Sequence, residues 1–266
     1  MSTQEFTNQQ EEGKVLLELI GPVATLTISR PAALNALTWT MYQQLESHLD
    51  YLVHNDTIRA VIMRGAGKAF AAGTDIAQFQ GFTVAEGLRY ERKMEAIFEK
   101  VEGFPKPVIA AIHGYAVGAG LFLSAACDLR YATPISRFGA PIARTMGNAL
   151  SLKNYARLET AFGTMRVSEM LFTARLFTAE EALQYGFLTE IIDEERIFAH
   201  VNEIARQVSL HAPLTMWAAK EARRRLRASQ PDIPFDDVLA RIYTSQDFAE
   251  GIRAYVEKRK PKWQGR

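Results

Sequence analysis

Hydrophobic and polar residues alternate along this chain in two distinct ways. Between residue 15 and about residue 195, short apolar runs are interleaved with longer stretches in which apolar residues recur every three or four positions. The short runs are typical of buried strands, and the longer stretches are typical of helices that bury one face. This alternation predicts an α/β fold in which most strands pair in parallel.

Particular segments of the first half predict particular elements. Strands are expected over residues 15–20, 23–28, 60–63 and 108–112, with a Gly21-Pro22 turn joining the first two. Thr38 is suited to cap a helix that extends to about Val53. A second helix is expected over residues 84–102, where apolar residues fall on one face. The small apolar residues of 117–126 predict a buried helix.

The pattern changes after about residue 195. Four helices are expected there, over residues 196–209, 214–228, 235–245 and 248–258. A helical tail of this length is too small for an independent enzyme domain, so we expect it to pack on the core or on a neighbouring subunit. The predicted organisation is a polar N-terminus (1–14), a core (15–195) and a helical oligomerisation region (196–266).

Composition narrows the possible functions. The chain has 266 residues, 48% of them hydrophobic, and its 31 Lys and Arg almost balance its 30 Asp and Glu. This excludes wholesale disorder and provides no overall charge that would attract nucleic acid or an anionic membrane. The single cysteine, Cys127, excludes an internal disulfide and a cysteine-rich zinc module. With no long apolar run and no secretory leader, a cytoplasmic protein is expected.

Common motifs for nucleotide, metal and hydrolase chemistry are absent. The stretch Gly65-Ala66-Gly67-Lys68 resembles a phosphate loop, but Ile62 stands where that motif requires glycine. Gly114, Gly118 and Gly120 have the reverse of the dinucleotide-binding spacing. The five histidines show no spacing typical of metal ligands. Neither a metal nor a separate cofactor is expected.

Two loops of small residues each follow a predicted strand, over residues 70–76 and 114–120. Small residues let a ligand approach the main chain, and the free N–H groups at a helix start favour negative charge. Two such loops side by side would aim two N–H donors at one oxygen, which is an oxyanion hole. Alternatively, both loops are tight turns that allow close packing of helix and strand. Spacing alone leaves both interpretations open.

From about Val15 to Trp263, the chain resembles the crotonase superfamily, which includes the enoyl-CoA hydratase/isomerase family. The resemblance rests on several sequence blocks that occur in order. They are Ile28-Ser29-Arg30-Pro31 with Leu34-Asn35-Ala36-Leu37, Gly67-Lys68-Ala69-Phe70-Ala71-Ala72-Gly73-Thr74-Asp75-Ile76, His113-Gly114-Tyr115-Ala116-Val117-Gly118-Ala119-Gly120, Cys127-Asp128-Leu129-Arg130-Tyr131-Ala132, Phe138-Gly139, Phe172-Thr173-Ala174-Arg175 with Ala179-Glu180-Glu181-Ala182, and Glu257-Lys258-Arg259-Lys260-Pro261.

The resemblance implies a crotonase-like spiral of ββα units followed by a helical trimerisation region. It also implies a homotrimer or a hexamer built as a dimer of trimers. The substrate would be an acyl-CoA thioester, with coenzyme A present as part of the substrate. By position, the N–H groups of Thr74 and Ala119 would form the oxyanion hole and hold a thioester enolate.

The same resemblance assigns the coenzyme A limb to two short segments and the C-terminal region. The limb would lie along Ala33, Leu34, Ala36, Ala72 and Ile76. Lys258 matches a family lysine that reaches coenzyme A across a subunit boundary, and an ammonium group is a suitable partner for phosphate. Alternatively, Lys258 is a solvated charge on the tail.

This chain departs from the family pattern at both catalytic glutamates. Phe122 and Ile142 occupy their positions, and neither side chain can carry a proton. Standard two-glutamate hydration is therefore not expected. Arg144, Thr145 and Asn148 remain nearby, and they could bind a polar acyl group, orient a water molecule or hold a substrate carboxylate. Alternatively, Thr145 and Asn148 cap the next helix and Arg144 pairs at a subunit contact.

Other polar residues favour structural interpretations. Glu86, Glu91 and Glu95 are interpreted as charges on a solvated helix face, although one of them could supply a base. His113 is expected to be a hydrogen-bonded structural residue and Cys127 a buried hydrophobic residue. The remaining assignments are that Asp75 and Asp128 fix loops and that Arg223, Arg224 and Arg225 form a solvated face, with contact to coenzyme A phosphates as the alternative.

The favoured hypothesis is an acyl-CoA enzyme of the enoyl-CoA hydratase/isomerase type, a lyase whose proton-transfer groups are non-standard. One alternative is an acyl-CoA-binding oligomer without catalysis. Another is a different reaction on the same fold, either decarboxylation or thioester hydrolysis.

Overall fold

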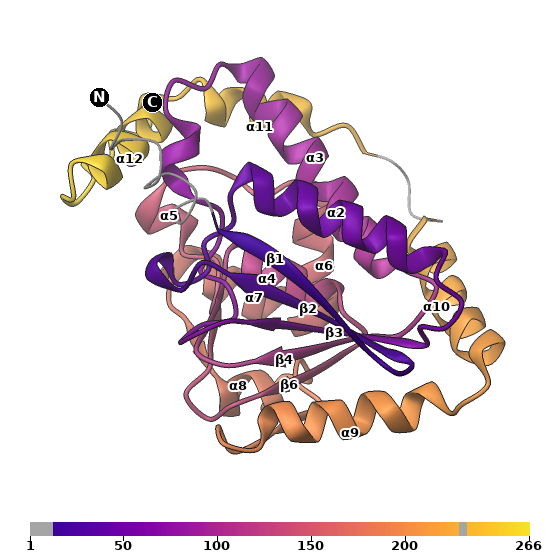
Figure 1. Cartoon of the computed structure of the whole chain (residues 1–266). Helices are drawn as coiled ribbons and strands as arrows, with labels where there is room; N and C mark the ends of the chain where they lie inside the picture. Colours follow the sequence, from indigo (N-terminus) through magenta and orange to yellow (C-terminus); the bar gives the residue numbers. More distant parts are fainter. Residues whose placement is uncertain (1–12, 229–232) are drawn as a thin grey trace, which may run out of the picture.

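A computed structural model describes residues 13–228 and 233–266 of the chain (Figure 1). Most of the predicted polar N-terminus, 1–14, therefore lies outside the described residues. Within them, no helix is both long enough and apolar enough to cross a membrane. The chain is a mixed α/β structure, as the hydrophobic pattern predicted.

A six-stranded sheet forms the centre of the molecule. Its order is β1-β2-β3-β4-β6-β9, in which β1 is antiparallel to β2 and all other neighbouring strands are parallel. The strands are β1 (Lys14–Ile20), β2 (Val23–Ser29), β3 (Ala60–Gly65), β4 (Val108–Ile112), β6 (Leu129–Ala132) and β9 (Glu190–Ile191). The four strands predicted from apolar runs are confirmed.

A second, smaller sheet lies beyond the carboxyl ends of these strands. It consists of β5 (Tyr115–Val117), β7 (Arg137–Gly139) and β8 (Phe177–Thr178), and an isolated bridge joins Ala71 to Ala116. The chain passes from β4 through β5 to α4 (Ala119–Ala126), and then from β6 through β7 to α5 (Ile142–Thr145). Each passage is a ββα unit whose two strands belong to different sheets.

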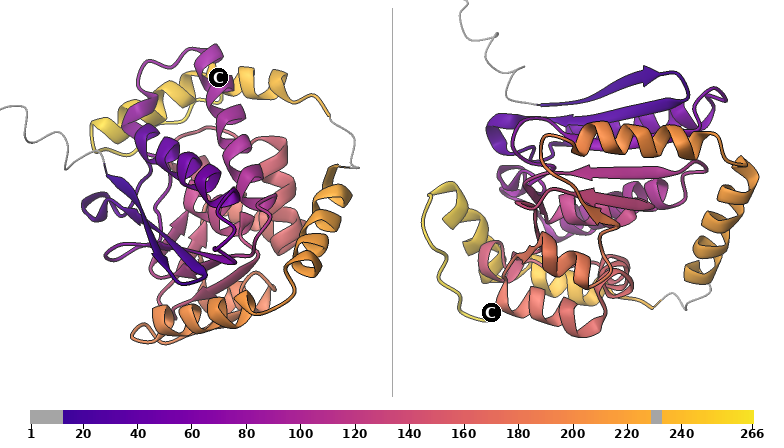
Figure 2. Two further views of the ribbon diagram at one scale, coloured as in Figure 1. Left: turned by 45° about the vertical axis from the view of Figure 1, so that its right-hand side comes forward. Right: turned by 90° about the horizontal axis from the view of Figure 1, so that it is seen from below.

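Strand alternation divides the core between the two faces of the large sheet. On one face, Val23, Ile62 and Ile109 pack against α9 (Ile197–Ser209), which lies across the strands (Figure 2). On the other face, Leu26, Met63 and Ala110 belong to the main core. Successive side chains of a strand point to opposite faces of the sheet, and here both faces are buried. The parallel strands are therefore continuous runs of apolar residues in the sequence.

The main core is closed by helices, several of which begin at a capping side chain. These are α2 (Trp39–Val53), α3 (Val84–Glu102), α4, α6 (Leu152–Phe162), α7 (Thr164–Thr173) and α8 (Ala179–Gln184). Thr38 caps α2 by accepting the Met41 N–H, as predicted. Thr83 and Glu86 form a capping box at the start of α3.

The C-terminal part is helical, as the periodicity predicted. After α9 come α10 (Pro213–Ala228), α11 (Asp236–Tyr243) and α12 (Gln246–Val256). α10 stands at one side of the molecule, whereas α11 and α12 turn back toward α3 and α5 (Figures 1 and 2). They pack on the short helix η2 (Ile76–Phe79). Gly251 of α12 lies against the backbone of Met146, and a Cβ added to Gly251 would be only 2.3 Å from the Met146 carbonyl oxygen. Whether this region mediates trimerisation stays a prediction.

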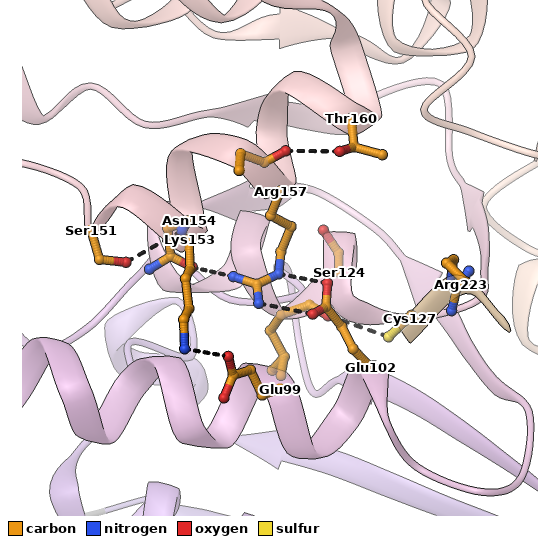
Figure 3. Close-up of polar contacts among 12 residues, drawn as sticks. Glu99, Glu102, Ser124, Cys127, Ser151, Lys153, Asn154, Arg157, Thr160 and Arg223 are labelled. Atoms are coloured by element: carbon orange, nitrogen blue, oxygen red, sulfur yellow. Dashed lines mark hydrogen bonds and ion pairs between the residues drawn. The ribbon is translucent and has the colours of Figure 1, made fainter. Parts of the chain in front are cut away.

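A buried ion pair joins two of the core helices (Figure 3). Arg157 of α6 donates to both carboxylate oxygens of Glu102 of α3, at 2.7 and 3.0 Å, and also to Asn154. Its guanidinium lies over the ring of Phe98, and Phe98 packs in turn on Phe122. The pair therefore fixes α6 against α3, on the side of α3 that meets α4.

Candidate active site

The two small-residue loops lie side by side, as the sequence suggested. The Ala71 N–H donates to the Tyr115 carbonyl at 2.9 Å, and the Val117 N–H donates back to the Ala71 carbonyl at 3.0 Å. These bonds place the start of α4 directly beside the Ala72-Gly73-Thr74 turn. The two loops come after β3 and β4, which are parallel neighbours in the large sheet, and the isolated bridge between Ala71 and Ala116 joins them.

Two glycines make this approach possible. Gly118, just before α4, has a φ of +54°, which disfavours any residue with a Cβ, and a Cβ there would lie 3.5 Å from the Gly73 Cα. At Gly120 an added Cβ would lie 2.1 Å from the Ala71 carbonyl oxygen, which is a severe overlap with backbone. The glycines allow close loop packing, and this packing also brings the main-chain amides of the two loops together.

The backbone geometry leaves the amides of Thr74 and Ala119 available. The Gly73 carbonyl accepts the Leu37 N–H at 2.8 Å, so the Thr74 N–H of the same trans peptide points the opposite way. Ala119 is the first residue of α4, where N–H groups have no partner inside the helix. A Cβ on Gly73 would lie 4.0 Å from the Ala119 nitrogen. Neither amide donates to another group within residues 13–228 and 233–266.

The Thr74 side chain is hydrogen-bonded in the protein interior. Its Oγ1 lies 2.7 Å from the Tyr42 hydroxyl and 3.0 Å from the Tyr90 hydroxyl. Burial raises the pKa of both phenols above the ordinary tyrosine value, so both are neutral hydrogen-bonding groups at neutral pH. Thr74 is therefore fixed through its side chain, and its amide is not part of these contacts.

The predicted coenzyme A residues fall on two adjoining segments. Ala33, Leu34 and Ala36 lie in or just after η1 (Pro31–Ala33), and the Leu34 carbonyl accepts the Ala72 N–H at 3.0 Å. Ile76 begins η2, on the same loop as Ala72. The structure thus brings these five residues together beside Thr74.

Buried polar contacts hold the two segments in place. The side-chain amide of Asn35 donates to the carbonyls of Ala66 and Ala69 at 2.8 and 2.6 Å. Arg30 pairs with Asp75 at 2.8 Å, and Asp75 also caps η2 by accepting the Ala77 N–H. The expected loop-fixing role of Asp75 is confirmed. Asp128 has the same role, because it accepts the Val108 N–H and binds Lys220 and Arg223 of α10.

Among the described residues, the Lys258 side chain makes no hydrogen bond with the segments predicted to hold coenzyme A. Lys258 is an exposed residue just after α12, with a left-handed φ of +52°. In the described part of the chain, its ammonium group makes no ion pair. Its predicted contact across a subunit boundary remains a prediction.

The end of β7 is hydrogen-bonded to the loop that precedes α4, because the Gly118 N–H donates to the Gly139 carbonyl at 2.9 Å. The residues that follow β7 therefore start beside this loop. Arg144 is exposed, and Thr145 donates its hydroxyl proton to the Pro141 carbonyl. The Asn148 Oδ1 is buried and has no hydrogen-bond partner among the described residues. Ser151, rather than Thr145 or Asn148, caps the next helix.

Both residues at the glutamate positions are apolar. Phe122 is buried one turn into α4 and packs on Phe98 at 5.9 Å between ring centroids. Ile142 is the first residue of α5 and half-buried. No carboxylate of α4 or α5 therefore borders the free amides.

One carboxyl group was misread from the sequence. Glu91 of α3 is buried, and it accepts the hydroxyl proton of Tyr243 from α11 at 2.7 Å. Burial raises the pKa of its carboxyl to about 7, a larger effect than the opposing hydrogen bond. The prediction of a solvated charge is wrong here because α11 covers this face of α3. Glu86 is partly exposed as expected, and its hydrogen bonds to Thr83 lower its pKa.

Other residues match their structural interpretations. His113 is buried and bonds to the Gly67 carbonyl at 2.9 Å, and burial lowers its pKa. Cys127 is buried. Arg224 and Arg225 are exposed and pair with Glu221, whereas Arg223 is half-buried and pairs with Asp128, so the predicted solvated face does not include Arg223. Within the described residues, no group of three histidine, cysteine, aspartate or glutamate side chains could hold a metal ion.

A cavity of about 470 Å³ lies between residues 79–82 and helices α11 and α12. Its lining is mainly apolar and includes Phe79, Phe82, Tyr243, Phe248 and Ile252. None of the residues predicted for the oxyanion hole or for coenzyme A lines it. Residues 79–82 and the C-terminal helices together form this cavity, and Phe79 in its lining packs on Tyr90, which bonds the Thr74 hydroxyl.

Comparison with known protein families identifies the family to which this chain belongs. Residues 20–266 match the model of the enoyl-CoA hydratase/isomerase family. The chain belongs to this family. The predicted resemblance to the crotonase superfamily is confirmed, and it extends over nearly the whole chain.

Named relatives of this family member are similar in length. It is 31% identical to the short-chain-enoyl-CoA hydratase of Clostridium acetobutylicum, over 94% of this chain and 97% of the relative. It is also 31% identical to the 2,3-dehydroadipyl-CoA hydratase of Escherichia coli, over 92% of this chain and 96% of the relative.

Solved structures share its crotonase fold. A methylmalonyl-CoA decarboxylase in complex with 2-nitronate-propionyl-CoA has a TM-score of 0.87 at 28% identity, and covers 95% of this chain and 98% of its own. An enoyl-CoA hydratase/carnitine racemase from Magnetospirillum magneticum has a TM-score of 0.77 at 31% identity, over 95% of this chain and 96% of its own.

Proposed function

We propose that this family member is an enzyme that acts on acyl-CoA thioesters through an enolate held by the amides of Thr74 and Ala119. The observation that carries the proposal is the pair of adjacent N–H groups, at the meeting of two loops, that have no acceptor among the residues described by the structure. The names of its relatives, which are hydratases and a decarboxylase of CoA esters, support the substrate class.

The two amides have a clear chemical use at this place. They would donate to the thioester carbonyl oxygen and bind it more strongly as it becomes an enolate oxygen, because the oxygen then carries more negative charge. The N-terminus of α4 adds its dipole to the Ala119 donor. The coenzyme A limb would lie along Ala33, Leu34, Ala36, Ala72 and Ile76, which border Thr74.

Among enolate-forming reactions, decarboxylation of a 2-carboxyacyl-CoA fits these residues best. The bond between the α-carbon and the carboxylate breaks, CO₂ leaves, and the electron pair forms the enolate. A proton from solvent then adds to the α-carbon, and the product is the shorter acyl-CoA. No general base is required to form the enolate, which agrees with Phe122 and Ile142 at the glutamate positions.

Two further observations support decarboxylation. Asn148 and Arg144 lie on the segment bonded to the oxyanion loop, where they are suited to bind a substrate carboxylate. The fold is also very similar to the methylmalonyl-CoA decarboxylase structures, with TM-scores of 0.84 to 0.87.

Hydration of an enoyl-CoA is the second candidate, because the named relatives that are 31% identical are hydratases. It would use the same enolate, but a water molecule would have to be activated by a group other than the two replaced glutamates. Thr145 and Asn148 would orient this water.

A panel of thioesters tests the proposal. Purified protein is incubated with methylmalonyl-CoA, malonyl-CoA and crotonyl-CoA, and CO₂, hydrated product and free coenzyme A thiol are measured separately. Release of CO₂ is the expected result. Water addition to crotonyl-CoA without CO₂ release would favour the second candidate, and release of free thiol alone would indicate a hydrolase. Binding of these esters with no turnover would mean an acyl-CoA-binding protein without catalysis.

We further propose that the protein is a homotrimer or a dimer of trimers, as its family resemblance implies. The exposed apolar residues of α10 support this, since Leu214 and Leu226 are 75% and 73% exposed in the single chain. In such an assembly, Lys258 of one subunit would reach the coenzyme A bound to its neighbour.

A further inference from the structure

Three hydroxyl groups converge behind the candidate oxyanion hole. The Tyr42 hydroxyl comes from α2 and the Tyr90 hydroxyl from α3, and both lie within hydrogen-bond distance of the Thr74 Oγ1, at 2.7 and 3.0 Å. Tyr42 is fully buried and Tyr90 half-buried. Two helices that are far apart in sequence thus bind one side chain of the loop.

Hydrogen-bond stoichiometry makes this cluster specific for threonine or serine. A hydroxyl group offers one donor and two acceptor positions, so Thr74 can donate to one phenol and accept from the other. Alanine at this position would leave the hydroxyl groups of the buried Tyr42 and the half-buried Tyr90 without this partner, and an unsatisfied buried group costs about 1–3 kcal/mol. The cluster therefore constrains which residue can stand at position 74.

The two phenols are themselves held by aromatic packing. The ring of Tyr90 lies 4.8 Å from that of Phe79 and 5.4 Å from that of Trp39, between centroids. Trp39 also packs on Tyr42 at 6.2 Å. Rings in such contacts have little freedom to turn, so their hydroxyl groups are presented to Thr74 from fixed positions.

The backbone beside Thr74 explains why such an anchor matters. Gly73 has a φ of +109°, and a glycine at this point permits the Gly73–Thr74 peptide to rotate. A threonine side chain has restricted χ1 freedom, so fixing Oγ1 also fixes its Cα and the direction of its N–H. The hydroxyl cluster therefore opposes this rotation together with the bond from the Leu37 N–H to the Gly73 carbonyl.

We propose that Tyr42 and Tyr90 are positioning residues that hold the Thr74 amide toward the substrate oxygen through the Thr74 hydroxyl. This inference rests on the proposed function, because it assigns the two tyrosines to the same oxyanion hole. Neither tyrosine contacts the reacting atoms, and the effect of each passes through Thr74.

Phenylalanine substitutions test the inference with a comparator inside the same protein. Tyr42→Phe and Tyr90→Phe are each expected to lower kcat by about tenfold with little change in KM, and Thr74→Val is expected to lower it at least as much. Thr74→Ser keeps the hydroxyl and should retain most of the activity. Tyr243→Phe removes a buried phenol that bonds Glu91 and does not reach Thr74, so its kcat should stay near the wild-type value.

A second measurement does not depend on turnover. Hydrogen–deuterium exchange of the peptide that covers residues 70–76 should become faster in Tyr42→Phe and Tyr90→Phe, but not in Tyr243→Phe. If exchange and kcat are unchanged in the first two variants, or change equally in all three, the positioning role is wrong. A wild-type protein that turns over no thioester would instead refute the proposed function, and the exchange result would still show whether the tyrosines anchor the loop.

Discussion

Ala119 occupies the first helical position of α4, where its N–H group has no partner in the described chain. Proline is well tolerated at such a position and lacks the N–H. Ala119→Pro is therefore expected to keep the fold while lowering kcat by about 10²–10³-fold, the usual effect of removing one oxyanion donor. Steady-state kinetics on the substrate identified above would measure it.

A proline at the start of another helix provides the control. Val84 is the first residue of α3 and follows Thr83, whose extended conformation suits a residue before proline. Val84→Pro should leave kcat close to the wild-type value. Equal activity of Ala119→Pro and the wild type would mean that the Ala119 amide does not bind the substrate oxygen.

Glu91 should make stability depend on pH in an unusual direction. Its pKa of about 7 in the folded chain lies above the ordinary value of 4.5, so the folded state holds the proton more tightly than the unfolded state. This contribution is fully present below pH 4.5 and is lost as pH rises to about 7, on the order of 3 kcal/mol in total.

Glu91→Gln removes this titration and can still accept the Tyr243 hydrogen bond. We expect the variant to be more stable than the wild type at pH 8, with the difference disappearing near pH 4.5, in urea unfolding at a fixed protein concentration. Glu18→Gln, on the exposed face of β1, should follow the wild type at both pH values. A constant difference between Glu91→Gln and the wild type would contradict the assigned pKa.

At the scale of elements, the contact between α3 and α6 depends on a buried charge. The Arg157 side chain is 3% exposed and that of Glu102 15% exposed, so removing one partner leaves the other charge poorly solvated. Arg157→Met is expected to lower the free energy of unfolding by about 3–5 kcal/mol. Adding Glu102→Leu should recover part of this loss, which chemical denaturation would measure.

An exposed ion pair between the same two helices is the matched control. Lys153 of α6 binds Glu99 of α3 at 2.8 Å, and both side chains are about half exposed (Figure 3). Lys153→Met should cost no more than about 1 kcal/mol, because solvent screens this pair. If the two single variants lose similar stability, burial does not govern the Arg157 contact.

At the scale of the whole molecule, α10 presents exposed leucines beside a core that is otherwise closed by helices. In the proposed trimer these leucines would be buried between subunits. Leu214→Glu combined with Leu226→Glu should shift the mass in solution from an oligomer to the 29.8 kDa monomer, as measured by light scattering.

Leu183→Glu, at an exposed position on α8, serves as the comparison and should leave the mass unchanged. A monomeric wild type would contradict the proposed assembly. If the double variant is a monomer, its KM for CoA esters should rise, since Lys258 could no longer reach a neighbouring subunit.

The amino-acid sequence alone determined where the strands, the helices and the two small-residue loops lie, because these features depend on local patterns of apolar and small residues. Apolar runs predicted β1 to β4, helical spacing predicted α2 and α3, and Thr38 predicted a cap. The glycines of the two loops indicated close backbone approach before any fold was known. The family resemblance then assigned Thr74 and Ala119 to one role, which remains a proposal.

Only the tertiary structure decided which polar groups lose water and which amides meet. Glu91 has the sequence surroundings of a surface residue, but α11 covers it and changes its acidity. The Thr74 loop lies beside the start of α4 because it follows β3, the parallel neighbour of β4, and two tyrosines from other helices fix the Thr74 side chain. Periodicity encodes which face of an element is buried, whereas burial of a single polar group depends on long-range packing that no local pattern records.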